Sequence, residues 1–112
     1  MVARYTPERG DVVWVTFDPT RGHEQRGRRP ALIVSPRAYN AASGLAIVCP
    51  ITSQIKGYPF EVSVTIQKKQ SAVLVDQARS LDWKERGVEK IQSAPARVIE
   101  EAQEYLKRLL FE

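Results

Sequence analysis

The sequence predicts a mainly β fold with one helix at its C-terminal end. Three observations support this prediction: short β-branched and aromatic runs recur along most of the chain, prolines and glycines separate them, and the hydrophobic period changes near the end. A run of strands followed by one helix favours a small curled antiparallel sheet with the helix packed on it. With 112 residues and no linker or repeat, residues 1–112 are predicted to form one domain able to bury a core.

The first half of the chain predicts three strands. Residues 11–17 (DVVWVTF) alternate β-branched and aromatic side chains. Residues 30–36 (PALIVSP) form a second strand, whose bracketing prolines we expect at strand ends because proline cannot donate to a ladder. Residues 45–53 (LAIVCPITS) form a third, in which Pro50 implies a bulge or an edge position. The segment RAYNAASG between them predicts one short helical turn.

The second half supplies the remaining strands. Residues 60–66 (FEVSVTI) alternate cleanly between apolar and polar side chains, which predicts a half-buried antiparallel strand. Residues 71–81 (SAVLVDQARSL) supply one or two more, and residues 88–92 (VEKIQ) a further short one. The sequence therefore predicts five to seven strands before the helix.

The C-terminal segment SAPARVIEEAQEYLKRLL has helical spacing. Its predicted apolar stripe consists of Val98, Ala102, Leu106 and Leu109, widened by Ile99, Tyr105 and Leu110. Ser93 is the predicted N-cap, and Pro95 suits the first turn. Early glutamates and the late Lys107 and Arg108 complement the helix dipole.

Composition narrows the class of protein. The formal charge of +4 is weak evidence for a nucleic-acid partner, so the positions of the basic residues must decide. The single cysteine, Cys49, excludes a disulfide framework within the chain and is predicted to be a small buried hydrophobe. The start of the chain lacks a secretory signal, and no apolar run approaches the ~20 residues of a membrane span. These features predict a soluble cytoplasmic protein without a membrane partner.

The most unusual segment is DPTRGHEQRGRRP, residues 18–30, because ordinary connections have only about 4–6 residues. It contains four arginines, the only histidine and a glutamate. Arg29 is followed directly by Pro30 and the second strand, so a rigid element should hold its backbone. A guanidinium binds phosphate oxygens with a planar fork and stays charged. The segment is therefore either an ordinary solvated loop or one that presents phosphate-binding charges, with Arg29 at its fixed end.

Polar side chains also follow later strands. They are Thr52, Ser53, Gln54 and Lys56 after the third strand, and Gln77 and Arg79 within DQARSLDW. If the second and third strands are neighbours, Arg29 and Thr52 share one face of the sheet. Trp14 and Trp83 are expected in the core or at an interface rather than as stacking platforms for bases.

Three segments in series carry a family resemblance. RGDVVWVTFDPTRGHEQRGRRPALIVSP, VCPITSQIKGYPFEV and VDQARSLDW resemble the MazF/PemK family of bacterial toxin endoribonucleases, from Tyr5 to about Val88, and the helix fits after them. The resemblance implies a small barrel of the Src-homology-3-like, CcdB/PemK type with a C-terminal helix, forming a homodimer. It implies sequence-specific cleavage of single-stranded RNA without a metal or other cofactor. It also implies a cognate MazE-like antitoxin, whose acidic C-terminal segment occupies the RNA groove.

The resemblance assigns site residues as well. It places the catalytic arginine at Arg29, the catalytic hydroxyl at Thr52 and a glutamate important for activity at Glu24. The implied RNA-contacting residues are His23, Gln25, Arg26, Arg28, Ser53, Gln54, Lys56, Gln77 and Arg79.

The residue inventory agrees with metal-free chemistry. In that reaction the 2′-hydroxyl attacks the adjacent phosphate and leaves a 2′,3′-cyclic phosphate and a 5′-hydroxyl, so the enzyme must move two protons and stabilise a phosphorane. One histidine cannot provide a two-histidine mechanism within one chain, and no His/Asp/Glu cluster has metal-ligand spacing. Arg29 and Thr52 remain, with the hypothesis that Glu24 orients Arg29 or accepts a proton.

Two other functions remain open from the sequence. One is a gyrase-poisoning, CcdB-like toxin on the same barrel, without nuclease activity, whose function would depend on the C-terminal residues. The other is a non-catalytic nucleic-acid-binding barrel, which the basic charge alone supports.

Overall fold

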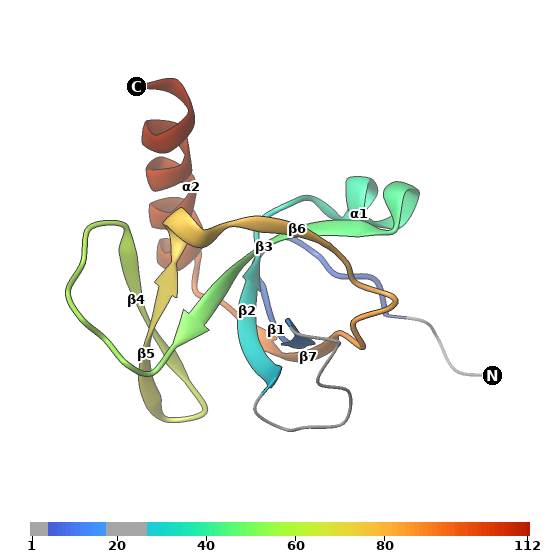
Figure 1. Cartoon of the computed structure of the whole chain (residues 1–112), viewed down its shortest axis with the longest axis horizontal. Helices are drawn as coiled ribbons and strands as arrows, with labels where there is room; N and C mark the ends of the chain where they lie inside the picture. Colours follow the sequence, from blue (N-terminus) through green and yellow to red (C-terminus); the bar gives the residue numbers. More distant parts are fainter. Residues whose placement is uncertain (1–4, 18–26) are drawn as a thin grey trace.

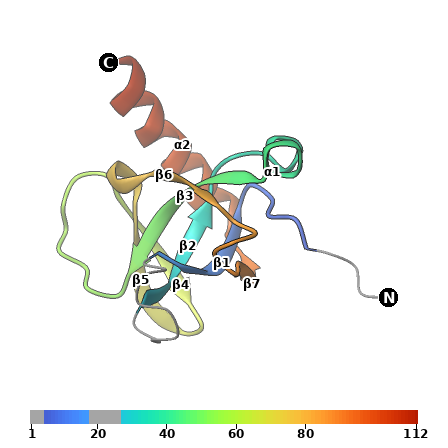
Figure 2. The ribbon, with the colours of Figure 1, turned by 45° about the vertical axis from the view of Figure 1, so that its right-hand side comes forward.

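The computed structural model describes residues 5–17 and 27–112. Its elements, in chain order, are β1 (Asp11–Thr16), β2 (Arg28–Ile33), α1 (Arg37–Ser43), β3 (Leu45–Thr52), β4 (Glu61–Ile66), β5 (Lys69–Leu74), the 3₁₀ turn η3 (Val75–Gln77), β6 (Arg79–Asp82), β7 (Glu89–Ser93) and α2 (Ala96–Phe111) (Figure 1). The strands form one antiparallel sheet in the order β4-β5-β3-β2-β1-β7, and β6 also pairs with β3. The sheet curls into a half-barrel, and α2 lies against one side of it (Figures 1 and 2). The predicted fold class is confirmed.

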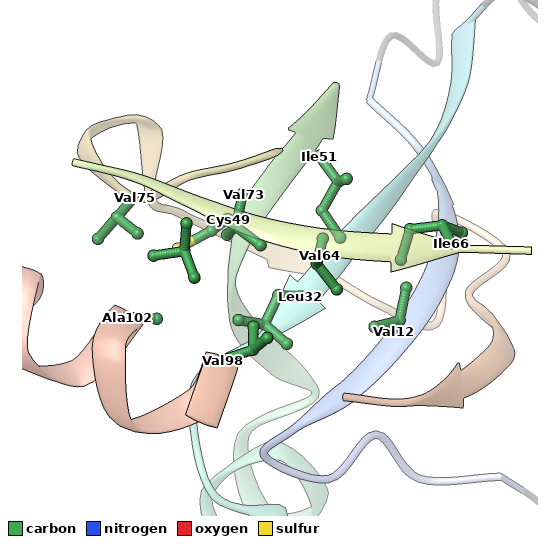
Figure 3. Close-up of a cluster of buried hydrophobic side chains, with 11 residues drawn as sticks. Val12, Leu32, Cys49, Ile51, Val64, Ile66, Val73, Val75, Val98 and Ala102 are labelled. Carbon is green, nitrogen blue, oxygen red and sulfur yellow. The ribbon is translucent and has the colours of Figure 1, made fainter. Parts of the chain in front are cut away.

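Both faces of the sheet are buried, because successive strand residues point to opposite sides. In β1, Val12 faces α2, whereas Val13 and Val15 face the other way. The helix-side core consists of Val12, Leu32, Cys49, Ile51, Val62, Val64, Ile66, Val73, Val75, Val98 and Ala102 (Figure 3). The opposite-face core consists of Val13, Val15, Ala31, Ile33, Ala46, Val48 and Leu81. The predicted burial of Cys49 is therefore confirmed.

Helix α2 begins differently from the prediction. Ser93 is the last residue of β7, Pro95 occupies the cap position, and no side chain caps the helix. The strand continues this far because the Ala94 N–H donates to Gly10 O at 2.7 Å. Ser93 as N-cap was therefore wrong.

The apolar stripe of α2 is buried only over its first turns. Val98 and Ala102 are fully buried, and the Tyr105 ring packs edge-on against Phe60 with the centroids 5.3 Å apart. Leu109 and Leu110, predicted to extend the stripe, are 42% and 71% exposed. Figure 1 shows the reason, since the C-terminal turns of α2 extend past the sheet.

Strand boundaries near prolines also differ from the prediction. Pro30 is not at a strand end but lies inside β2, opposite Trp14 of β1. Toward β3, however, pairing starts only at Ala31, which lies opposite Pro50. Because proline has no N–H to donate, Pro30 ends the β2–β3 ladder, and the two strands diverge beyond it (Figure 1).

Pro50 lies where β3 changes neighbours. Residues 45–48 pair with β6, whereas Ile51 and Thr52 pair with β5. Pro50 therefore falls between the two ladders, where no partner needs its missing N–H. This agrees with the expectation of an irregular position.

The remaining segments differ from the sequence prediction only in detail. Helix α1 ends at Gly44, whose φ of +74° suits the left-handed cap. Residues 71–81 are divided by η3 into the end of β5 and the start of β6. Across the residues that the structure describes, neither helix is long and apolar enough to cross a membrane.

Candidate functional site

A pocket of about 350 Å³ lies where β2 and β3 diverge. It is lined by Trp14, Arg29, Pro30, Ile51, Thr52, Ser53, Gln54, Ile66, Gln67, Lys69 and Ser71. The missing ladder bond at Pro30 keeps β3 from continuing alongside β2, so side chains from both strands face the space between them. Pro30, which ends the pairing of β2 with β3, therefore also opens the pocket between them.

Arg29 enters the pocket from the β1–β2 ladder. Its backbone is paired opposite Val15, and it precedes Pro30, so its main chain is fixed on two sides. The Phe17 N–H donates to Gly27 O at 3.0 Å, which holds together the two described ends of the long charged segment. Arg29 is exposed, as a residue that meets a ligand from solvent must be.

Thr52 enters from the end of β3, where it pairs with Ala72 of β5. Its Oγ1 accepts a hydrogen bond from the Gln54 N–H at 3.0 Å. This bond uses a lone pair of the hydroxyl and leaves its proton available to a ligand. Ser53 and Gln54 line the pocket directly after it. The structure thus brings four of the predicted site residues together: Arg29, Thr52, Ser53 and Gln54.

The pocket has an apolar part and a cationic part. Trp14, Pro30, Ile51 and Ile66 supply apolar surface, while Arg29 and Lys69 are the charged residues among those that line it. No carboxylate belongs to this lining within the described ranges. Such a site favours an anionic group attached to a flat apolar one.

Trp14 was expected in the core or at an interface, and the core position was wrong. It is half-buried and lines the pocket, because it lies opposite Pro30 at the point where β2 leaves β3. Trp83 is also half-buried, but it packs against the opposite-face core and its Nε1–H donates to Asn40 O at 2.9 Å.

The β4–β5 hairpin contributes three residues to the pocket that the sequence did not predict. They are Gln67, Lys69 and Ser71, which we call the hairpin wall. The two residues at the hairpin tip, Gln67 and Lys68, have φ of +48° and +70°, as a two-residue hairpin turn requires. A signal was present, because the alternating run FEVSVTI meets a polar QKK step before a second apolar run. The turn lacks the asparagine–glycine pair that usually marks such hairpins.

Other predicted site residues lie outside the lining of the pocket. Arg28 forms an ion pair with Glu89 of β7. Lys56 lies over the Tyr58 ring at 5.9 Å, and Arg79 lies over the Phe17 ring at 5.7 Å.

Gln77, also predicted in the site, is exposed in η3, away from the pocket lining. His23, Glu24, Gln25 and Arg26 fall outside the described residues. Their assignments remain predictions.

Cys49 takes no part in this site. Burial, with a smaller contribution from Asp76, raises the pKa of its thiol to about 12. The thiol is therefore protonated and unreactive at neutral pH. In the described part of the chain, no group of three or more His, Cys, Asp and Glu residues could hold a metal ion.

Comparison with known proteins identifies relatives over nearly the whole chain. The family model described as "PemK-like, MazF-like toxin of type II toxin-antitoxin system" matches residues 8–110. The endoribonuclease toxin MazF of Escherichia coli K12 is 49% identical over 90 residues, which cover 80% of this chain and 81% of that protein.

Solved structures agree. The crystal structure of MazF from Deinococcus radiodurans superposes with a TM-score of 0.85 at 48% identity, covering 97% of this chain and 100% of the other. A MazE–MazF structure from the same organism gives a TM-score of 0.83 at 44% identity, covering 96% and 98% of the two chains.

Proposed function

The chain belongs to the PemK-like, MazF-like toxins of type II toxin–antitoxin systems, and from this premise we propose that it is a sequence-specific endoribonuclease that cleaves single-stranded RNA in the β2–β3 pocket. One observation carries the proposal for the site. Arg29 and Thr52 line one pocket that contains two cations and, among its described lining residues, no carboxylate. A phosphodiester is the anion that such a pocket would bind in an RNA substrate.

The chemistry that we assign to these two residues is electrostatic. The Arg29 guanidinium binds the non-bridging oxygens of the scissile phosphate and stabilises the additional charge of the phosphorane. The Thr52 hydroxyl, oriented by the Gln54 N–H, donates its proton to a phosphate oxygen as a hydrogen bond. Both groups therefore bind the transition state more strongly than the substrate, as catalysis requires.

The bonds change at one phosphorus. The 2′-oxygen attacks it, the bond to the 5′-oxygen breaks, and the products are a 2′,3′-cyclic phosphate and a 5′-hydroxyl. The 2′-hydroxyl loses a proton and the departing 5′-oxygen gains one. We assign Glu24 the role of accepting the first proton or orienting Arg29, an assignment that comes from the family resemblance. A guanidinium resists deprotonation, so Arg29 is not our choice for the base.

Recognition of an unpaired base fits the rest of the pocket. The Trp14 indole and Pro30 offer flat apolar surface next to the cations, and a base can lie on such surface only when it has left its stack. The Gln54 and Gln67 amides each carry a donor and an acceptor for base edges.

We propose that the RNA on either side of the cleaved phosphate contacts the predicted residues outside the pocket, and that the basic side chains among them bind its phosphates. These predicted residues are His23, Gln25, Arg26, Arg28, Lys56, Gln77 and Arg79, with Ser53 inside the pocket. Phosphate contacts of this kind give affinity that falls with salt concentration and does not depend on sequence.

The biological setting follows from the relatives. MazF of D. radiodurans has been crystallised with MazE, and we propose a MazE-like antitoxin as the partner of this chain. We also propose a homodimer that acts in the cytoplasm, where cleavage of mRNA inhibits translation and growth.

The test is an end-group analysis. The purified protein is incubated with a long unstructured RNA in EDTA, and the fragments are labelled by a kinase without prior phosphatase treatment. We expect discrete fragments that label at once, because their 5′ ends are hydroxyls. Arg29→Ala should lower kcat by about 10²–10³-fold, as removal of one transition-state donor does, while Thr52→Val should give a smaller loss of the same kind.

The rival functions give other outcomes. Intact RNA together with stalled gyrase would identify a CcdB-like toxin. RNA that is bound but not cut would identify a binding barrel. Full activity of Arg29→Ala would remove Arg29 from the reaction.

A further inference from the structure

The hairpin wall is weakly attached to the sheet that carries Arg29 and Thr52. Strand β5 pairs with β3 at only two positions, Ile51 opposite Val73 and Thr52 opposite Ala72. The hairpin continues beyond them to its tip at residues 67–68, so no strand pairs with the outer side of β5 over residues 69–71. Something else must fix the tip if the hairpin wall is to face the pocket.

Gln92 of β7 makes that connection. Its Nε2–H donates to Thr65 O at 3.1 Å, and its Oε1 accepts from the Gln67 N–H at 3.4 Å. Strands β4 and β7 are the two ends of the sheet order. One side-chain amide therefore joins the opposite edges of the half-barrel through both its donor and its acceptor.

A bulge in β7 gives Gln92 the direction that it needs. Val12 of β1 pairs with Gln92, but Val13 pairs with Lys90, so Ile91 has no residue of its own opposite it. In a regular strand Ile91 and Gln92 would point to opposite faces. Ile91 packs against the helix-side core, and the extra residue allows Gln92 to turn toward the same side.

Packing in the helix-side core holds the end of β4 but does not reach the hairpin tip. Ile66 packs in the helix-side core with Val12, as Figure 3 shows, and fixes the end of β4 next to β1. The exposed tip residues Gln67, Lys68 and Lys69 lie beyond this packing. Besides the pairing of β4 with β5, the hydrogen bonds at residues 65 and 67 connect this tip to β7.

We propose that Gln92 is a positioning residue for the reaction, holding the β4–β5 hairpin so that Gln67 and Lys69 face Arg29 and Thr52 across the pocket. The role in catalysis rests on the proposed endoribonuclease function. Gln92 itself does not line the pocket, and it acts through the hairpin. It therefore affects how RNA is held more than how the phosphate reacts.

The test compares two glutamine variants. Gln92→Met keeps the length of the side chain and removes both hydrogen bonds. Gln70→Met is the matched control, because Gln70 lies on the same hairpin and accepts from Thr65 Oγ1 at 2.8 Å without reaching β7. The substrate is a short RNA that contains one mapped cut site, and binding is measured with the same oligonucleotide carrying a 2′-deoxyribose at that site.

For Gln92→Met we expect KM to rise about three- to tenfold, which is the loss of one or two modest hydrogen bonds, with kcat within about twofold. Binding of the 2′-deoxy oligonucleotide should weaken by the same factor. Gln70→Met should change neither. Gln92→Glu keeps the acceptor for the Gln67 N–H and loses the donor to Thr65 O, so its KM should fall between those of the wild type and Gln92→Met.

Hydrogen exchange provides a readout that needs no RNA. The Gln67 amide should exchange faster in Gln92→Met than in the wild type or Gln70→Met, while the amides of β2 and β3 stay protected. Unchanged exchange and unchanged KM would overturn the proposal, as would equal effects of the two methionine variants. A wild-type protein that leaves RNA uncut would refute the proposed function, and the exchange result would still decide whether Gln92 holds the hairpin.

Discussion

Substitution of Gly10 by alanine should destabilise the fold through a contact visible in the structure. Gly10 lies just before β1 with φ +95°, and a Cβ there would lie 2.6 Å from Ile99 Cδ1 of α2. The backbone conformation costs a non-glycine residue about 1–2 kcal/mol. Overpacking adds about 1 kcal/mol, the low end of its usual range, because Ile99 Cδ1 is the free end of a half-buried side chain that can rotate away. The lower entropy of the unfolded alanine chain returns about 0.4–1 kcal/mol.

The expected net loss is about 1–2.5 kcal/mol of unfolding free energy. At about 2.1 cal/mol/K of unfolding entropy per residue, this lowers the Tm by about 4–11 °C for a chain of 112 residues. Urea unfolding and calorimetry measure the two quantities separately.

Two further variants isolate the contact. Gly57 also has a left-handed φ, +72°, but a Cβ there meets nothing within 4 Å, so Gly57→Ala should show only the backbone cost. Ile99→Val removes the methyl group that would collide, and in the Gly10→Ala background it should restore about 1 kcal/mol. Equal losses for the two glycine variants would refute the argument, as would simple additivity of Gly10→Ala with Ile99→Val.

Two more predictions concern Trp14 and Cys49. Trp14→Ala should raise KM for RNA about 5- to 150-fold, the loss of one base–aromatic stack, whereas Trp83→Phe should lower the Tm and leave KM unchanged; similar KM values for both variants would contradict the assignment of Trp14. The pKa of Cys49 is raised from 9.0 to about 12 by burial, so above pH 9 the unfolded thiol loses its proton while the folded one keeps it. The free energy of unfolding should therefore decrease as pH rises from about 9 toward 12, and urea unfolding should show a flatter decrease in Cys49→Ala; parallel curves would exclude this linkage.

Most of the fold could be predicted from local patterns, because the alternation of apolar and polar residues in strands and the helical spacing of apolar residues are properties of short segments. The run FEVSVTI forms β4 from its second residue on, with Val62, Val64 and Ile66 in the core as their spacing requires. Phe60, with φ +70°, lies in the turn before the strand. The C-terminal helix formed where its period predicted, but exposure of Leu109 and Leu110 depends on where the sheet ends. Periodicity carries no information about that distance.

The site was harder to predict because it depends on where pairing stops. The proximity of Arg29 and Thr52 required only that the second and third strands be neighbours. The sequence predicted both strands, and the structure pairs them and places both residues in one pocket. Trp14 lines the pocket because Pro30 lies opposite it inside β2, whereas Pro30 was expected at a strand end. The hairpin wall depends on a turn at residues 67–68 that lacks the usual asparagine and glycine. It also depends on Gln92, which belongs to the distant strand β7.

The pocket is assembled from two parts that differ in how tightly they are built into the fold. Arg29 lies on the β1–β2 ladder, and Thr52 lies at the end of β3, opposite Ala72 at the attached end of the β4–β5 hairpin. Gln67 and Lys69 lie at the far end of that hairpin, beyond its two paired positions with β3. Selection can therefore alter the turn without replacing Arg29 or Thr52, the proposed cleavage residues. On the proposed function, a lineage of such toxins could change the RNA sequences it recognises by exchanging a few exposed turn residues, while the proposed cleavage residues are inherited unchanged.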